Sequence, residues 1–186
     1  MKAVLLSIKP NWCKLIWSGM KTVDVRKTRP KLETPFKVYI YCTGHDGFVM
    51  KLPKAGVQKM DGRVIGQFTC EKIDKLVHIG TMMDINILTL DGWYKPADAL
   101  LQTACLTEAQ AKKYLKGGDG YGWHISDLKI YDKPVKLKDF WAIQPCTHRG
   151  DCCTCRRWDA EKLICRGEAF GIERPPQSWY YVEEGR

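Results

Sequence analysis

The chain has 186 residues, of which 45% are hydrophobic and 11% aromatic, so it can fold around a core and is not a disordered polymer. It carries 30 Lys and Arg against 21 Asp and Glu, a formal net charge of +9 with a pI near 9.1, which favours an anionic partner, nucleic acid before an anionic membrane surface. No apolar run approaches the ~20 residues of a membrane span, and no secretion signal is visible. We therefore expect a cytoplasmic protein with reduced thiols.

The first predicted elements are a strand over residues 4–8 and a short amphipathic helix over residues 10–18. Pro10 suits a first helical position, and Gly19 suits the left-handed residue that ends a helix. Helical spacing predicts that one face of this helix packs inward, a face made of Trp12, Leu15, Ile16 and Met20.

After Gly19 the periodicity changes to two, which predicts a strand. Val23 and Val25 fall on one face, and Asp24 and Arg26 on the other, about 6–7 Å apart at ~3.3 Å per residue. Lys21 stands where helix, turn and strand meet. A carboxylate, a guanidinium and an ammonium gathered in this way suit a phosphate- or base-bearing ligand, although an exposed surface ion pair is an equal alternative.

The rest of the chain reads as further strands with one clear helix. Residues 36–42, 63–77, 121–135 and 179–182 are predicted strands, residues 43–62 are mostly loop, and residues 84–101 are ambiguous. Residues 107–115 form a helix capped by Thr107. This pattern predicts an α+β fold, an antiparallel or mixed barrel with two or more flanking helices.

Five of the nine cysteines lie within twenty residues near the C-terminus. Cys152 and Cys155 form a C-x2-C pair, the spacing that lets two thiolates of one turn bind a single zinc ion. The segment is poor in aliphatic residues, so a metal would order it. We predict a structural zinc held by Cys146, Cys152, Cys155 and Cys165, with His148 or Cys153 as alternatives for the fourth position.

Four positions, Gly19, Lys21, Asp24 and Arg26, resemble the G-x-K-x-x-E-x-R signature of ASCH domains, a branch of the PUA-like β-barrels. Residues 5–10, 64–68 and 121–128 resemble strands of those domains in the same order, and residues 175–183 resemble phage-encoded members. The chain departs from the family at two positions: Asp24 stands in place of the signature glutamate, and Gln67 stands in place of a glutamate on a later strand. The resemblance implies a PUA-like barrel over residues 1–144. Together with the cysteine spacing, this predicts a zinc-knuckle insertion over 145–174 and a closing strand of the barrel over 175–186.

Three functions remain open at this point. The first is binding of nucleic acid, with RNA favoured because PUA-like relatives handle RNA or modified bases; its predicted contacts are Lys21, Asp24, Arg26, Gln67, Trp123, Lys112 and Lys113. The second, implied by the resemblance, is hydrolysis of an acylated cytidine or of RNA, with Lys21 and Asp24 as the acid–base pair. The third is a phage protein-interaction module that uses the cysteine-rich segment and residues 84–101.

Overall fold

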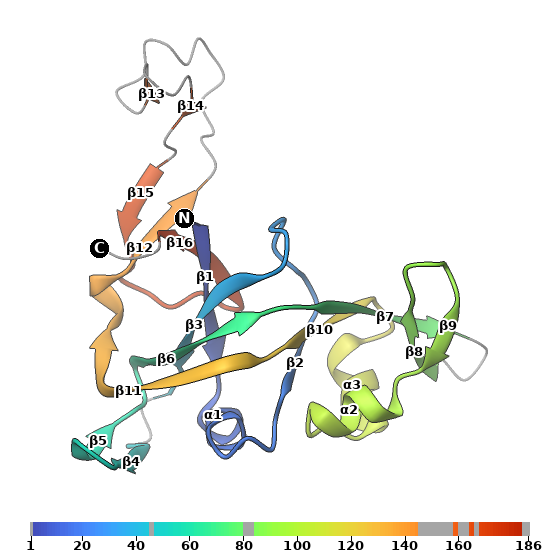
Figure 1. The fold of residues 1–186 in the computed structure, drawn as a ribbon, viewed down its shortest axis with the longest axis horizontal. Coiled ribbons are helices and arrows are strands. Elements are labelled where there is room, and N and C mark those ends of the chain that lie inside the picture. Colours follow the sequence, from blue (N-terminus) through green and yellow to red (C-terminus); the bar gives the residue numbers. More distant parts are fainter. Residues whose placement is uncertain are drawn as a thin grey trace.

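The computed structural model describes residues 2–44, 47–79, 84–144, 158–159, 164–165 and 168–183. These residues form a seven-stranded sheet and a five-stranded sheet, with three α-helices and two small two-stranded ribbons (Figure 1). Neither large sheet closes on itself in the described residues, so the predicted barrel takes the form of two open sheets. In the same residues, no helix is long and apolar enough to cross a membrane.

The seven-stranded sheet is built around β1, which pairs in parallel with β3 and antiparallel with β16. The predicted strands over residues 4–8, 36–42 and 179–182 are confirmed by these pairings. In sheet order its strands are β11 (Ser126–Lys136), β6 (Arg63–Cys70), β3 (Phe36–Cys42), β1 (Lys2–Ile8), β16 (Trp179–Glu183), β12 (Trp141–Gln144) and β15 (Glu168–Gly171).

The five-stranded sheet is covered on one face by two helices, α2 (Asp98–Thr103) and α3 (Glu108–Leu115). Val23, Leu76 and Ile87 pack against these helices from three of its strands. Thr107 caps α3 as predicted, in a capping box with Gln110. In sheet order its strands are β2 (Val23–Arg26), β10 (Gly120–His124), β7 (Ile73–Ile79), β8 (Asp84–Leu88) and β9 (Tyr94–Pro96).

Two long predicted strands are each divided between the sheets. Residues 63–77 form β6 in the large sheet and β7 in the small one, and residues 121–135 form most of β10 and β11 in the same way. Each crossing from one sheet to the other lies at a point that no glycine or proline marks, so the sequence carries no strong break there. Residues 43–62, predicted as mostly loop, contain the hairpin of β4 (Val49–Leu52) and β5 (Gly56–Lys59).

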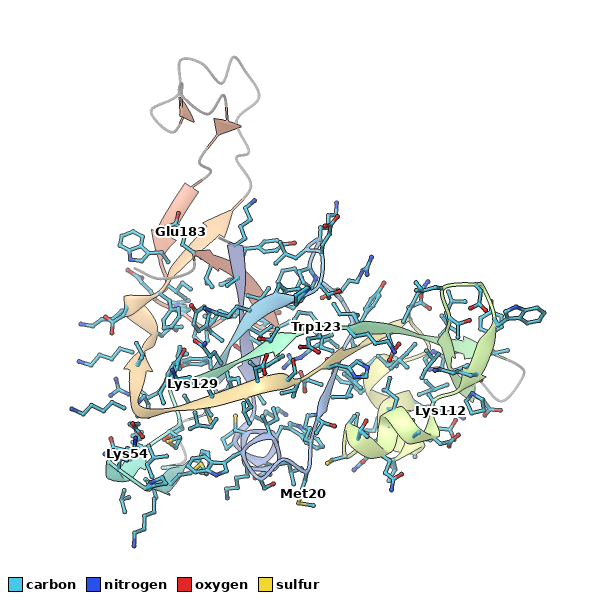
Figure 2. The ribbon with its side chains drawn as sticks, in the orientation of Figure 1. Met20, Lys54, Lys112, Trp123, Lys129 and Glu183 are labelled. Carbon is cyan, nitrogen blue, oxygen red and sulfur yellow. The ribbon has the colours of Figure 1, made fainter. Side chains whose placement is uncertain are left out.

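The main core lies between the large sheet, Trp123 near the end of β10 and helix α1 (Pro10–Trp17). Cys13 and Ile16 bury one face of α1, as the spacing predicts for Ile16. Met20, predicted to belong to the same face, is 65% exposed because the chain has left the helix by then, and Figure 2 shows it at the edge of the molecule. Leu137–Asp139 forms a single 3-10 turn (η1) that leads into β12.

Strands β12 and β15 are neighbours at one edge of the large sheet. Those two strands pair directly, up to Gln144 opposite Glu168, although β15 falls within the predicted insertion. Between them the structure describes a two-stranded ribbon, β13 (Trp158–Asp159) and β14 (Ile164–Cys165), drawn at the top of Figure 1.

Candidate functional site

The turn after α1 places Lys21, Asp24 and Arg26 together. Gly19 ends the helix with a φ of +74°, and the backbone N–H of Lys21 returns to the carbonyl of Leu15 at 3.0 Å. From there β2 runs as the edge strand of the small sheet, with Asp24 and Arg26 on one face as predicted.

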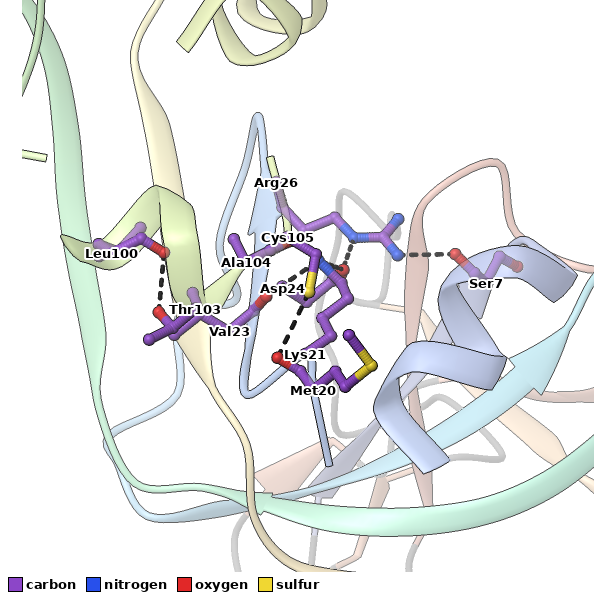
Figure 3. A network of polar contacts seen from close by, with 10 residues as sticks. All are labelled: Ser7, Met20, Lys21, Val23, Asp24, Arg26, Leu100, Thr103, Ala104 and Cys105. Atoms are coloured by element: carbon purple, nitrogen blue, oxygen red, sulfur yellow. Dashed lines mark hydrogen bonds and ion pairs between the residues drawn. The ribbon is translucent and has the colours of Figure 1, made fainter. Parts of the chain in front are cut away.

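The three charged side chains form a buried network (Figure 3). Asp24 accepts from Arg26 Nε at 2.6 Å through Oδ2, and its Oδ1 lies 3.3 Å from Lys21 Nζ. Arg26 Nη2 also donates to the carbonyl of Ser7 at 2.7 Å. Lys21, Asp24 and Arg26 are only 3%, 5% and 9% exposed, which excludes the alternative of a surface ion pair.

The Lys21 ammonium has every proton engaged. Its Nζ donates to the carbonyls of Val23 and Ala104, both at 2.9 Å, in addition to its contact with Asp24. An ammonium has three donors, so all of them are used. Burial alone would raise the pKa of Asp24, but the nearby charges and hydrogen bonds of Arg26 and Lys21 outweigh it and lower that pKa. The network thus holds one carboxylate and two cations.

This network forms part of the wall of a cavity of about 630 Å³, which we call the Arg26 pocket. That volume is typical of sites for small molecules. Two aromatic side chains line it, Trp12 from α1 and Tyr114 from α3, and the Trp12 ring centre lies 4.9 Å from Lys21 Nζ. Other lining residues come from four further segments: Ser7 to Lys9, Thr43, Leu106, and the loop of Pro175, Pro176 and Gln177.

Three polar groups in the pocket wall, on Gln110, Arg26 and Tyr114, keep donors for a ligand. Gln110 uses its side-chain oxygen to accept from the backbone N–H of Thr107 at 2.9 Å, and no described residue accepts from its amide nitrogen. The Nη1 group of Arg26 is likewise without an acceptor among the described residues. Burial is the largest cause of the raised pKa of Tyr114, so its hydroxyl stays neutral and can also donate.

The structure does not bring the other predicted contacts into this pocket. Gln67 lies on the opposite face of the large sheet from α1, where its Oε1 accepts from the Tyr131 hydroxyl at 2.7 Å. Trp123 is fully buried, its ring packed at 5.8 Å from Phe36 and 6.2 Å from Trp179, so it cannot stack on a base.

The predicted basic contacts on α3 lie beside the pocket and do not line it. Lys112 is paired with Asp84 and Glu108, both at 3.1 Å, whereas Lys113 is exposed. Sequence reasoning missed Gln110 and Tyr114 on the same helix. Their i,i+4 spacing, which puts them on one helix face, was the available signal.

The predicted zinc ligands cannot be placed by this structure. Cys146, Cys152 and Cys155, with the alternatives His148 and Cys153, lie outside the described residues, and only the backbone of Cys165 is described, in β14 opposite Trp158. Within the described part of the chain, no group of three or more His, Cys, Asp or Glu side chains could hold a metal ion. The zinc site therefore stays a prediction from the spacing of the cysteines.

No protein-family model and no curated protein matches the chain. Among solved structures it is similar to the crystal structure of ASCH from Zymomonas mobilis, with 21% identity over 73% of this chain and 73% of that chain, and a TM-score of 0.48. Two mutant proteins of the same ASCH are similar too. The tyrosine-to-phenylalanine mutant has 22% identity over 74% of this chain and 77% of that chain, with a TM-score of 0.47. The serine-to-alanine mutant has 19% identity over 98% of this chain and 89% of that chain, with a TM-score of 0.48. A likeness at this level concerns the arrangement of the backbone and assigns neither a family nor an activity to the chain.

Proposed function

We propose that this protein binds nucleic acid, RNA in preference to DNA, and that one nucleotide of the ligand enters the Arg26 pocket. The observation that carries the proposal is a buried network of two cations and one carboxylate in the wall of a nucleotide-sized cavity that aromatic side chains also line. Single-stranded RNA is recognised in this manner, by stacking of splayed bases on aromatic rings and by hydrogen bonds to their edges.

Each part of the pocket has a chemical role in this proposal. Arg26 offers Nη1 to a base carbonyl or a phosphate oxygen, and its orientation is fixed by Asp24 on one side and Ser7 on the other. Trp12 and Tyr114 offer ring faces to a base, and the Gln110 amide nitrogen can donate to an acceptor on the base edge. The net charge of +9 supplies the salt-dependent attraction to phosphates.

The resemblance to ASCH domains supports the same site. The residues at three signature positions, Lys21 and Arg26 with Asp24 in place of the glutamate, are those that make the buried network. The stretch that resembles phage-encoded members supplies Pro175, Pro176 and Gln177 to the pocket wall. We therefore extend the proposal to a phage-type ASCH protein of the PUA-like group.

The contacts of Lys21 favour binding over hydrolysis at this site. A lysine that acts as a base or nucleophile needs a free amine. Here all three donors of Lys21 are engaged, one of them by a carboxylate. Hydrolysis of an acylated cytidine or of RNA through Lys21 and Asp24 would first have to break these contacts.

The test is a binding titration with labelled single-stranded RNA, hairpin RNA and duplex DNA across a salt series. We compare the wild type with Tyr114→Ala, which removes a pocket ring, and with Tyr180→Ala, which removes a surface ring of similar exposure on β16. Tight RNA binding that weakens with salt, and weakens again only in Tyr114→Ala, supports the proposal. Absence of binding to all three ligands at low salt refutes it, and a pull-down that survives nuclease treatment would then favour the protein-interaction function.

A further inference from the structure

One face of the five-stranded sheet is not covered by α2 and α3. Strand register places a row of side chains across this face, one from each strand: Arg26 is opposite Tyr121, Tyr121 opposite Lys75, Lys75 opposite Leu88, and Leu88 opposite Tyr94. Directly paired residues point to the same face, so the five side chains form one line. With strands ~4.8 Å apart, the line is roughly 19 Å long.

This row starts at the Arg26 pocket and continues into a second cavity. The second cavity, which we call the sheet groove, has a volume of about 1120 Å³ and is lined by Tyr121, Lys75 and Leu88 of the row. The two cavities share no lining residue, but Arg26 of the first and Tyr121 of the second are directly paired across β2 and β10, which brings the cavities next to each other along the row. Figure 1 shows β8 and β9 at the end of the small sheet remote from β2.

Four cations and three carboxylates line the groove, and two of the cations have no carboxylate partner among the described residues. These two are Arg29, whose guanidinium carbon lies 6.0 Å from the ring centre of Tyr121, and Lys95 on the edge strand β9. Two other lysines of the groove are paired, Lys72 with Asp74 at 2.8 Å and Lys75 with Asp119 at 2.9 Å. Carboxylates of Glu33 and Asp91 also line the groove.

The far end of the groove is an exposed hairpin with aromatic side chains. Trp93 is 73% exposed and Tyr94 58% exposed, next to Leu90, which is fully exposed. The turn is well formed, because the Thr89 N–H and hydroxyl both donate to the carbonyl of Trp93. An ordered turn that holds large rings in solvent is a candidate binding surface.

We propose that the groove is a track for a single-stranded nucleic acid, which runs from the Arg26 pocket across Tyr121 to stack on Trp93 and Tyr94. The proposal rests on the proposed function, since the strand enters from that pocket. Interleaved rings and cations are what sequence-tolerant single-strand binding requires, the rings for the bases and the cations for the phosphates. A protein partner for the same hairpin is one outcome of the test.

The experiment compares a trinucleotide with a twelve-nucleotide single-stranded RNA, both fluorescently labelled. The variant Trp93→Ala with Tyr94→Ala removes the two hairpin rings, and Trp141→Ala is the control, an exposed tryptophan on β12 in the other sheet. We expect the twelve-nucleotide RNA to bind the hairpin variant at least about tenfold more weakly, since each stacked base contributes on this scale. Binding of the trinucleotide, and of both ligands to the control, should not change.

A second variant, Arg29→Gln with Lys95→Gln, tests the cations that face the phosphates. Its plot of log affinity for the longer RNA against log salt should be shallower by about 0.7 for each phosphate that the variant no longer neutralises. If both variants bind the longer RNA like the wild type while Tyr114→Ala weakens it, the track is wrong and the pocket stands. If the wild type binds neither RNA, the pocket and the track are both refuted, and capture of a protein through Trp93 and Tyr94 becomes the alternative.

Discussion

Replacing Lys21 with methionine should destabilise the protein strongly, because the ammonium joins three buried groups. Methionine keeps an unbranched side chain but removes the donors to the carbonyls of Val23 and Ala104 and the ion pair with Asp24. Hydrogen bonds to a charged group contribute ~1.5–3 kcal/mol each and are not additive. Removing one partner of a buried ion pair costs about 3–5 kcal/mol, and we expect a loss of stability of this size.

Equilibrium unfolding in urea at neutral pH measures this loss directly. The matched control is Lys14→Met, which removes an exposed lysine of α1 whose ammonium lies 5.0 Å from the Phe48 ring centre, and it should change stability little. The m-value should stay constant if the variant unfolds in the same two-state transition. A loss below about 1 kcal/mol for Lys21→Met would refute the reasoning, because a buried charge network cannot lose a member at so small a cost.

Three further predictions concern acid, packing and metal. Folding lowers the pKa of Asp24 from 3.8, so its ion pairs stabilise the fold above about pH 4, and this stabilisation is lost as the pH falls through the lowered pKa. In Asp24→Asn, the free energy of unfolding should therefore depend less on pH on the acid side. Gly66→Ala should cost about 1–3 kcal/mol in urea unfolding, because a Cβ there would lie 2.5 Å from the carbonyl of Lys129, whereas Gly171→Ala, with nothing within 4 Å, should cost little. Elemental analysis of protein made in zinc-containing medium should find one zinc per chain, reduced in Cys155→Ser, and an absence of zinc in the wild type would contradict the predicted site.

Periodicity predicted the local elements well where one strand stayed in one sheet. Phe36–Cys42 alternates between two buried faces and forms β3 with the predicted bounds, and the Thr107 cap fixes the start of α3. The predicted strand over residues 63–77 missed the point where β6 passes into β7: the adjacent charged residues Glu71 and Lys72 interrupt the alternation there, but no glycine or proline marks the crossing. Sheet membership depends on partners far along the chain, which a local pattern does not encode.

The same limit explains which site residues could be predicted. Lys21, Asp24 and Arg26 lie within six residues, so a turn and a strand suffice to bring them together. The face of the sheet on which Gln67 lies depends on its pairing with Tyr39. The sequence alone does not distinguish a buried core tryptophan, which Trp123 is, from an exposed one on which a base can stack. Residues from α3 reached the pocket only through the packing of that helix on the small sheet.

The position of β16 between β1 and β12 has a consequence for how the protein is made. Leu5 of β1 pairs with Tyr180 of β16, so the centre of the large sheet cannot form until nearly the whole described chain has left the ribosome. At ~5–20 residues per second this is a delay of roughly ten seconds or more, during which the apolar β1 keeps an open edge. Such an edge is a pairing template for other chains, which makes nascent β1 a natural client for chaperones.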